Sequence, residues 1–319
     1  MNDQRINSLT KATSMPPISG DTDVYLILGD PIEQVLAPEI FNPLFACFGI
    51  DAVLVPVQVA QQNLHAFVKT AFLAKNIKGM WVTIPHKVPV MDVLDHSSDL
   101  ARLAGAVNAI RRNADDTLEG GLFDGEGFVS SLDYFGIAYA DKKVLIVGAG
   151  GAAAAIGASL VLPRATGNAA EVALFDPTSG KAAEVAARLQ AVNTARVVAV
   201  SSSAPDRFDL VVNASPLGLQ TTDPLPCDVA RLEPHAALVD IVMKNYPTPV
   251  VQAARARGVH AEPGFEMLIQ QAHLYMNFFG FHDIAVALRQ DTRTIRQQIY
   301  PQTLLDESAE TGQEFFATP

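Results

Sequence analysis

The apolar positions of the N-terminal part follow two different spacings in turn. Residues 24–28, 52–57 and 79–84 are short, largely apolar runs that are typical of buried strands. Between them, residues 39–48 and 61–74 carry apolar side chains at the three- and four-residue spacing of a helix that buries one face. This alternation predicts an open α/β domain in the first hundred residues.

The C-terminal half repeats the alternation of strands and helices. We expect strands at residues 144–147, 171–175, 196–200, 210–212, 237–240 and 260–262. Helices are expected between them at 151–162, 180–190 and 248–257, and after them at 265–279 and 284–298. A strand–helix–strand rhythm of this kind predicts a doubly wound, Rossmann-type sheet.

These patterns divide the chain into parts. We predict a flexible leader over residues 1–22, a first domain over 23–123 and a doubly wound domain over 124–263. The helices of residues 264–300 are expected to pack back on the first domain, and residues 301–319 form a polar, acidic tail.

Composition narrows the class of protein. The chain has 319 residues and a net charge of -11, which argues against a nucleic-acid or anionic-membrane partner because both need a basic surface. Cys47 and Cys227 are too few and too far apart for a disulfide framework or metal cluster. No apolar run reaches the roughly 18 residues of a membrane span. We expect a cytoplasmic monomer or homodimer without a bound metal.

The stretch around Gly148 has the strand–glycine turn–helix pattern that is typical of a dinucleotide-binding site. A β-branched apolar strand runs into Gly148-Ala149-Gly150-Gly151-Ala152, and an uncharged small-residue helix follows. Gly148 would turn the chain, and Gly150 would let the backbone approach a pyrophosphate at the helix N-terminus. The alternative is an alanine-rich packing helix that follows a glycine turn.

Asp176 ends the next strand, about where a carboxylate binds the adenosine ribose. It lies further from Gly148 than the usual ~20 residues, and the loop at 162–168 accounts for the excess. A carboxylate accepts hydrogen bonds from the ribose hydroxyls and repels a 2′-phosphate, so this position predicts NAD in preference to NADP. The alternative is an aspartate that only caps the following helix.

Seven short motifs occur in one order along most of the chain, and together they resemble the shikimate dehydrogenase family. They are Gly-Asp-Pro-Ile at 29–32, Val-Thr-Ile-Pro-His-Lys at 82–87, Gly-Ala-Val-Asn at 105–108, Asp-Gly at 124–125, the glycine loop at 148–152, Asn-Ala-Ser-Pro-Leu-Gly at 213–218, and Gly-Phe-Glu-Met-Leu-Ile-Gln-Gln-Ala at 264–272.

The resemblance implies that Lys87 and Asp124 flank the reacting hydroxyl. Lys87 follows a strand end, where side chains face the cleft of an open sheet and a desolvated amine can exchange a proton. Asp124 begins a helix that would stabilise its anion. We assign Lys87 as the acid/base and Asp124 as its orienting partner, with the roles open to sharing.

The resemblance also implies contacts with substrate and cofactor. Asn108 and Gln271 would bind substrate hydroxyls, and Thr83 would line the pocket; for Asn108 a purely structural role is the rival. The cofactor side would further include Asn213, Ser215, Val242, Gly264 and Met267, for which plain core packing is the alternative.

The substrate end departs from the family pattern. Val35 and Ala37 stand where the family has two serines that bind a carboxylate, Trp81 replaces an asparagine, and Phe123 replaces a threonine. All of these changes make the site more apolar. We therefore expect a shikimate-like or quinate-like cyclic hydroxy acid whose carboxylate is held otherwise, or a less polar ring alcohol.

Two other functions compete with a dehydrogenase. One is a non-catalytic nucleotide-binding regulator on the same fold, which would have no need of both Lys87 and Asp124. The other is a tetrahydrofolate dehydrogenase with a similar two-domain build, which the motif at 82–87 makes less attractive.

Overall fold

The computed structural model describes residues 17–191, 195–220, 222–244 and 247–311. It separates into two compact units. Unit 1 holds the chain up to Phe123 together with Gln271–Ile299, and unit 2 holds Asp124–Gln270 together with the residues from Tyr300 onward. Most of the predicted leader and the last residues of the predicted tail lie outside the described residues.

Unit 1 contains a mixed six-stranded sheet in the order β2-β1-β3-β5-β6-β4. Its strands are β1 (Asp23–Gly29), β2 (Ala52–Gln58), β3 (Ile77–Val82), β4 (His96–Ser97), β5 (Ala109–Arg112) and β6 (Leu118–Gly121). β1 pairs in parallel with β2 and β3, whereas β5 is antiparallel to both β3 and β6. The parallel part places the ends of β1 and β3 side by side.

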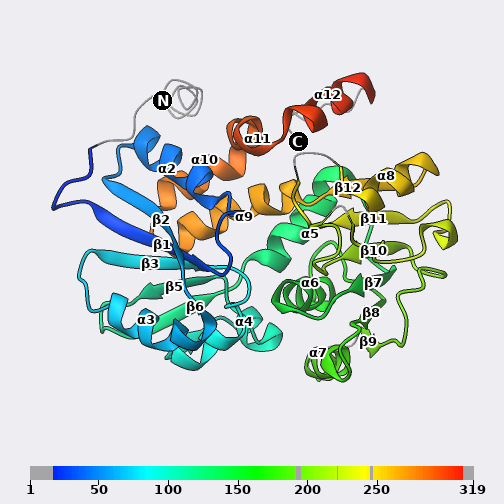
Figure 1. Cartoon of the computed structure of the whole chain (residues 1–319), viewed down its shortest axis with the longest axis horizontal. Coiled ribbons are helices and arrows are strands. Elements are labelled where there is room, and N and C mark those ends of the chain that lie inside the picture. The colour runs from blue at the N-terminus through cyan, green and yellow to red at the C-terminus, as the bar shows by residue number, and fades with distance from the viewer. Residues whose placement is uncertain (1–16, 192–194, 221, 245–246, 312–319) are drawn as a thin grey trace. The chain divides into compact units, whose positions relative to one another are not determined.

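Helices cover both faces of this sheet (Figure 1). They are α2 (Ala37–Phe48), α3 (Leu64–Ala71), α4 (Asp99–Ala104), α10 (His282–Gln290), α11 (Arg293–Ile299) and the C-terminal half of α9 (Phe265–Phe278). Three 3₁₀ turns complete the described chain: Gln61–Asn63 and Pro89–Val93 in unit 1, and Val229–Arg231 in unit 2.

An aromatic cluster forms much of the core of unit 1. Trp81 stacks on Tyr275 with ring centroids 5.3 Å apart and also packs against Tyr25, Phe41 and Phe279. Only 2% of Trp81 is exposed. Burying rings of this size contributes strongly to the stability of a core, so β1, β3, α2 and α9 are held together by their aromatic residues.

Unit 2 contains a fully parallel six-stranded sheet in the order β12-β11-β10-β7-β8-β9. Its strands are β7 (Lys143–Val147), β8 (Glu171–Phe175), β9 (Arg196–Ala199), β10 (Leu210–Asn213), β11 (Ala237–Asp240) and β12 (His260–Pro263). This is the predicted doubly wound order, and the strand order reverses between β7 and β10. Ligands of such sheets bind outside the carboxyl ends of the strands at this point.

The helices of unit 2 are α5 (Asp124–Phe135), α6 (Gly151–Val161), α7 (Lys181–Gln190), α8 (Pro249–Ala256), the first half of α9 and α12 (Gln302–Thr311). In Figure 1, α6 and α7 lie on one side of the sheet and α8 lies on the other. The two α/β sheets confirm the predicted fold class.

Three local predictions differ from the structure. The single helix expected at 284–298 is two helices, α10 and α11, because Asp291 leaves the helix and its carboxylate accepts from the backbone N–H of Arg293 at 2.9 Å. The expected tail contains α12, whose Leu304 is buried. The strand expected at 79–84 begins and ends two residues earlier, as β3.

Candidate active site

The opening loop of unit 1 lies against the start of the lysine motif. Thr83 donates its backbone N–H to Leu28 at 2.9 Å, and Asp30 donates to the carbonyl of Ile84 at 3.1 Å. A Cβ on Gly29 would come within 2.7 Å of the Thr83 methyl group. Glycine is therefore needed at position 29 so that these two segments, which are far apart in sequence, can lie together.

The turn that carries Lys87 is fixed on both sides. Val107 donates its backbone N–H to the Lys87 carbonyl at 2.9 Å. The buried ring of His86 binds through Nε2 to the carbonyl of Val59 at 2.7 Å, which requires that this nitrogen carry the proton. Lys87 itself is partly exposed. The main chain at Lys87 is thus held in place in the turn that follows β3.

Asn108 and Gln271 come together in unit 1, although they are distant in sequence. The buried Asn108 donates its side-chain N–H to Gln271 Oε1 at 3.2 Å, and its side-chain oxygen accepts from the backbone N–H of Phe123 at 3.0 Å. Its carbonyl accepts from Val82 at 2.8 Å. These bonds satisfy a buried amide, as its structural role would require, and they also hold Gln271 beside it.

The four departures from the family pattern lie in different surroundings, and one of them, Phe123, packs against Tyr275 and Phe278. Ala37 is the buried first residue of α2, and Val35 is partly exposed in the turn before it. Trp81 packs within the aromatic cluster, and its buried Nε1 has no hydrogen-bond partner. A buried N–H without a partner costs about 1–3 kcal/mol. At Trp81 this cost is set against the packing of its ring on Tyr275 and Phe279.

Asp124 begins α5 in unit 2 and is 4% exposed. The next residue, Gly125, lies directly against the carbonyl of Ala155 and the hydroxyl of Ser159 in α6, where a Cβ would clash. This close approach fixes the N-terminal end of α5 against α6. Lys87 belongs to unit 1, and its pairing with Asp124 stays a prediction.

Two glycines of the loop after β7, Gly148 and Gly150, lie in different surroundings. Gly148 has a φ of 112°, and a Cβ there would lie 2.6 Å from the carbonyl of Ala214. The loop is thus packed against the segment after β10, at the point where the strand order reverses. Gly150 has an ordinary φ of -81°, and a Cβ there would meet nothing within 4 Å.

No contact within the described chain requires glycine at position 150. Because a Cβ there would meet no other atom, the space in front of the loop is open. The first turn of α6 begins at Gly151, with Ala152 next, and the backbone N–H groups of a first helical turn have no partner inside the helix. Open space and free donors at a helix N-terminus fit the pyrophosphate of a dinucleotide.

Asp176 is tied to the loop that it follows. Its Oδ2 accepts from the backbone N–H of Ala149 at 2.9 Å, its Oδ1 accepts from that of Thr178 at 2.9 Å, and Lys181 lies 3.5 Å away. Burial alone would raise the pKa of Asp176, but these hydrogen bonds and the Lys181 ammonium together lower it. The carboxylate is therefore ionised and bound to the protein's own main chain.

Asn213 and Ser215 belong to a buried polar network centred on Asp240. The Asn213 side chain donates to Asp240 Oδ1 at 2.9 Å and accepts from the Ser215 hydroxyl at 2.6 Å. Asp240 also accepts from the backbone N–H of Val242 at 3.0 Å and from the Thr248 hydroxyl at 2.5 Å. The network thus joins three of the residues that we predict to contact the cofactor.

Sequence reasoning missed Asp240. Burial raises the pKa of its carboxyl to about 6, against the opposing effect of the three hydrogen bonds. The signal was present in the sequence, because an acidic residue closes a buried apolar strand at its carboxyl end, where site residues of an open sheet gather. The remaining predicted cofactor residues are also buried: Gly264 packs against the backbone of Ile241, and Met267 is 7% exposed.

The described part of the chain contains no group of three or more His, Cys, Asp or Glu side chains placed to hold a metal ion. Within the same residues, no helix combines the length and the apolar character needed to cross a bilayer.

Comparison with known proteins identifies the family. The model of the shikimate dehydrogenase substrate binding domain matches residues 27–110. The chain is 34% identical over 262 residues to the shikimate dehydrogenase (NADP(+)) of Rubrobacter xylanophilus, covering 81% of this chain and 90% of that protein. The chain belongs to the shikimate dehydrogenase family. The resemblance read from the seven motifs is thereby confirmed.

Solved structures give the same result. The shikimate dehydrogenase of Aquifex aeolicus has a TM-score of 0.74 at 26% identity, covering 86% of this chain and 100% of that one. The 5-ketofructose reductase of a Gluconobacter species has a TM-score of 0.71 at 26% identity, covering 85% and 99%. As a member of this family, the protein is a dehydrogenase, an oxidoreductase that acts on a CH–OH group.

The predicted preference for NAD over NADP is wrong. The curated relatives are named for NADP(+), and the solved structures similar to this chain include a complex with NADP+. The physical reason lies in the surroundings of Asp176. Its carboxylate accepts hydrogen bonds from backbone N–H groups and lies beside the Lys181 ammonium. An acidic residue at this position therefore does not by itself report on the ribose.

Proposed function

We propose that this protein uses NADP(H) to interconvert a ring alcohol and its ketone, and that the substrate resembles shikimate or quinate in its hydroxyls. The substrate's carboxylate, where it has one, is not bound by the opening loop. The observation that carries this proposal is the pair Val35 and Ala37, since neither side chain can donate a hydrogen bond to an anion.

The cofactor would be held mainly by main chain. Gly148 and Gly150 shape the loop, the first turn of α6 offers its N–H groups to the pyrophosphate, and Lys181 is the cation beside the end of β8 that would meet a 2′-phosphate. Bound NADP supplies a hydride acceptor for the carbon that bears the hydroxyl. Val242 and Met267 would pack near the nicotinamide.

Lys87 would take the hydroxyl proton during oxidation and return it during reduction. Its backbone is held by Val107 and by the anchored ring of His86, so the main chain from which the amine extends is fixed. Asp124 at the start of α5 would orient that amine and balance its charge. Asn108 and Gln271, which already bond to each other, would receive the neighbouring hydroxyls, with Thr83 at the pocket wall.

Three features support an uncharged group where the family binds a carboxylate. Val35 and Ala37 are apolar, Trp81 is turned into the aromatic cluster, and Ile84 and Val88 on either side of Lys87 are both half exposed. The similarity to a protein named 5-ketofructose reductase also supports substrates other than shikimate itself.

The test is a set of initial rates with NADP and with NAD for shikimate, quinate and carboxylate-free cyclic polyols, together with NADPH oxidation by the corresponding ketones. We expect turnover with NADP and a higher kcat/KM for a carboxylate-free compound than for shikimate. Efficient shikimate turnover at micromolar KM would refute the substrate assignment, and absence of any turnover would leave the nucleotide-binding regulator as the better account.

A further inference from the structure

The C-terminal half of α9 carries a proposed substrate ligand. Gln271 is 3% exposed and accepts a hydrogen bond from Asn108 at 3.2 Å. One turn further on, Tyr275 donates its hydroxyl hydrogen to the Asn108 carbonyl at 3.4 Å. The place of Gln271 therefore depends on how firmly this half of α9 is held to the sheet of unit 1.

The last turn of α9 lacks a basic residue of the kind that commonly stabilises the C-terminal end of a helix. Its last-turn carbonyls have no partner inside the helix and carry the negative end of the helix dipole, yet no residue of its last turn is basic. The cation comes from β5 instead. Arg111 Nη1 donates to the carbonyl of Phe278 at 2.6 Å, and the guanidinium lies 4.7 Å from the centroid of the Phe278 ring.

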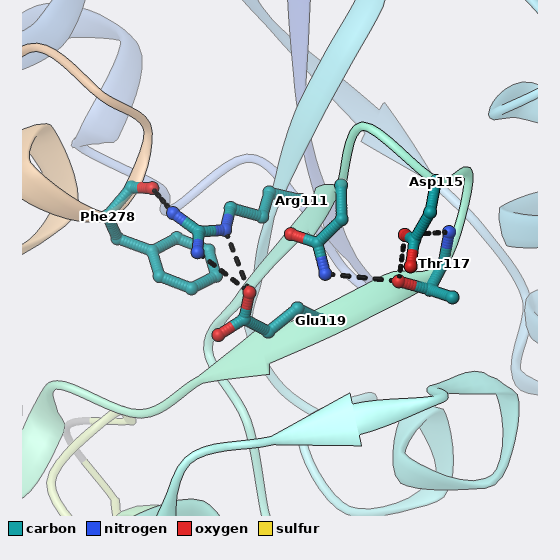
Figure 2. A network of polar contacts seen from close by, with 6 residues as sticks. Arg111, Asp115, Thr117, Glu119 and Phe278 are labelled. Atoms are coloured by element: carbon teal, nitrogen blue, oxygen red, sulfur yellow. Dashed lines mark hydrogen bonds and ion pairs between the residues drawn. The ribbon is translucent and has the colours of Figure 1, made fainter.

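Glu119 orients this guanidinium, as Figure 2 shows. It lies directly across the β5–β6 pair from Arg111, and its Oε2 accepts from Nε at 3.0 Å and from Nη2 at 2.7 Å. The third nitrogen is left to point at Phe278. Because both side chains are about one-third exposed, the ion pair itself contributes little to stability, and its effect is directional.

We propose that Arg111 is a positioning residue of the substrate site, which fixes the C-terminal end of α9 and thereby the side chain of Gln271. This inference rests on the proposed role of Gln271 in binding a substrate hydroxyl. It extends that role to a residue that touches neither substrate nor cofactor, and no motif of the sequence pointed to it.

The chain offers a matched control on the same strand. Arg112 follows Arg111, and its Nη1 donates at 2.7 Å to the carbonyl of Phe72, the C-cap residue of α3. Both arginines therefore bind the C-terminal end of a helix in unit 1. α3 carries none of the proposed site residues, so the two substitutions should be similar in their effect on stability and different in their effect on the substrate.

The experiment compares Arg111→Met, Arg111→Lys and Arg112→Met in the full-length protein. Arg111→Met should raise the KM of the best substrate about five- to tenfold with the KM for NADP unchanged, because a favourable cation at a helix C-terminus is lost. Arg111→Lys should recover part of this loss, since its ammonium can still reach the Phe278 carbonyl. Arg112→Met should leave both KM values near those of the wild type.

Amide hydrogen exchange gives a second readout that needs no turnover. Arg111→Met should speed exchange over residues 271–281, and Arg112→Met should speed it near residues 68–75 instead. If Arg111→Met does not fold, Glu119→Gln replaces it, with the same direction and a smaller effect. Equal substrate KM and equal exchange over 271–281 in the Arg111 and Arg112 variants would overturn the inference. A wild-type protein without dehydrogenase activity would refute the proposed function, and the exchange data would still decide on Arg111.

Discussion

The proposed site in unit 2 is built mainly from main-chain groups, whereas the proposed site in unit 1 is built mainly from side chains. In unit 2 the predicted cofactor loop is shaped by glycines and offers backbone N–H groups, and its acidic side chains bind the protein itself. In unit 1 the predicted substrate positions are side chains: Lys87, Asn108 and Gln271 keep the family's residue types, whereas Val35 and Trp81 do not. A site made of main chain changes little with sequence, and a site made of side chains can change its ligand by a few substitutions.

The largest effect should come from removing the proposed acid/base in unit 1. Lys87→Met should lower kcat by about 10²–10⁴-fold, the usual contribution of a positioned proton donor or acceptor. NADP binding, measured by titration of the cofactor, should stay close to that of the wild type because the proposed cofactor site lies in unit 2. Lys78→Met, which removes a surface lysine paired with Asp23, is the matched control and should be nearly silent. A Lys87→Met variant that loses NADP affinity but keeps its kcat would contradict the assignment of the acid/base to unit 1 and of the cofactor site to unit 2.

The next effect concerns the apolar positions of the opening loop. Val35→Ser with Ala37→Ser should raise kcat/KM for shikimate by about ten- to a hundredfold, since each hydrogen bond to a charged group is worth about 1.5–3 kcal/mol before losses elsewhere. Gln34→Ser adds a hydroxyl at an exposed position of the same loop and should not change the rate. An unchanged shikimate rate in the double variant would mean that these two positions do not decide against a carboxylate.

A smaller effect is expected at the proposed 2′-phosphate position of unit 2. Lys181→Met should weaken NADP about tenfold and NAD much less, because only NADP presents a phosphate to this ammonium. The dissociation constants of both cofactors, measured by fluorescence titration, provide the check. Lys142→Met, which removes a half-exposed lysine near Asp209 in the same unit, serves as the control. Equal weakening of NAD and NADP would place the phosphate elsewhere.

The buried carboxyl of Asp240 should make the stability of the protein depend on pH. Its pKa is raised to about 6 in the folded protein from 3.8, so the unfolded chain loses its proton first as pH rises. This group should therefore lower the free energy of unfolding by up to about 3 kcal/mol as the pH rises from 4 to 7.

Urea unfolding at both pH values, in the wild type and in Asp240→Asn, isolates this contribution. The free energy of unfolding of the wild type, relative to that of Asp240→Asn, should be lower at pH 7 than at pH 4. A difference that is the same at pH 4 and pH 7 would show that Asp240 does not titrate in this range.

Sequence reasoning reached the fold because its signals are local. The apolar strand that runs into Gly148 and the alternating strands and helices are periodic patterns, and the structure confirms the doubly wound order. The cofactor preference failed because Asp176 was read without its partners, and bonds to Ala149 and Thr178 depend on how the loop folds.

Contacts between distant residues were out of reach for the same reason. Nothing in the order of residues shows that Arg111 meets the Phe278 carbonyl, that Asp240 gathers Asn213 and Thr248, or that Trp81 stacks on Tyr275. The substitutions at Val35 and Ala37 could be seen in the sequence, but which compound they favour depends on a shape that is set by side chains from several elements.

The most direct test of the contrast between the two units is the ratio of kcat/KM for methyl shikimate and shikimate, both measured with NADP. The two compounds share the ring and its hydroxyls and differ only at the carboxyl group, where the ester has no charge and carries one methyl group more. We predict that the ester is used at least as well as the acid. A preference for the acid of a hundredfold or more would contradict it, because a group in the site would then be binding the carboxylate that Val35 and Ala37 cannot hold.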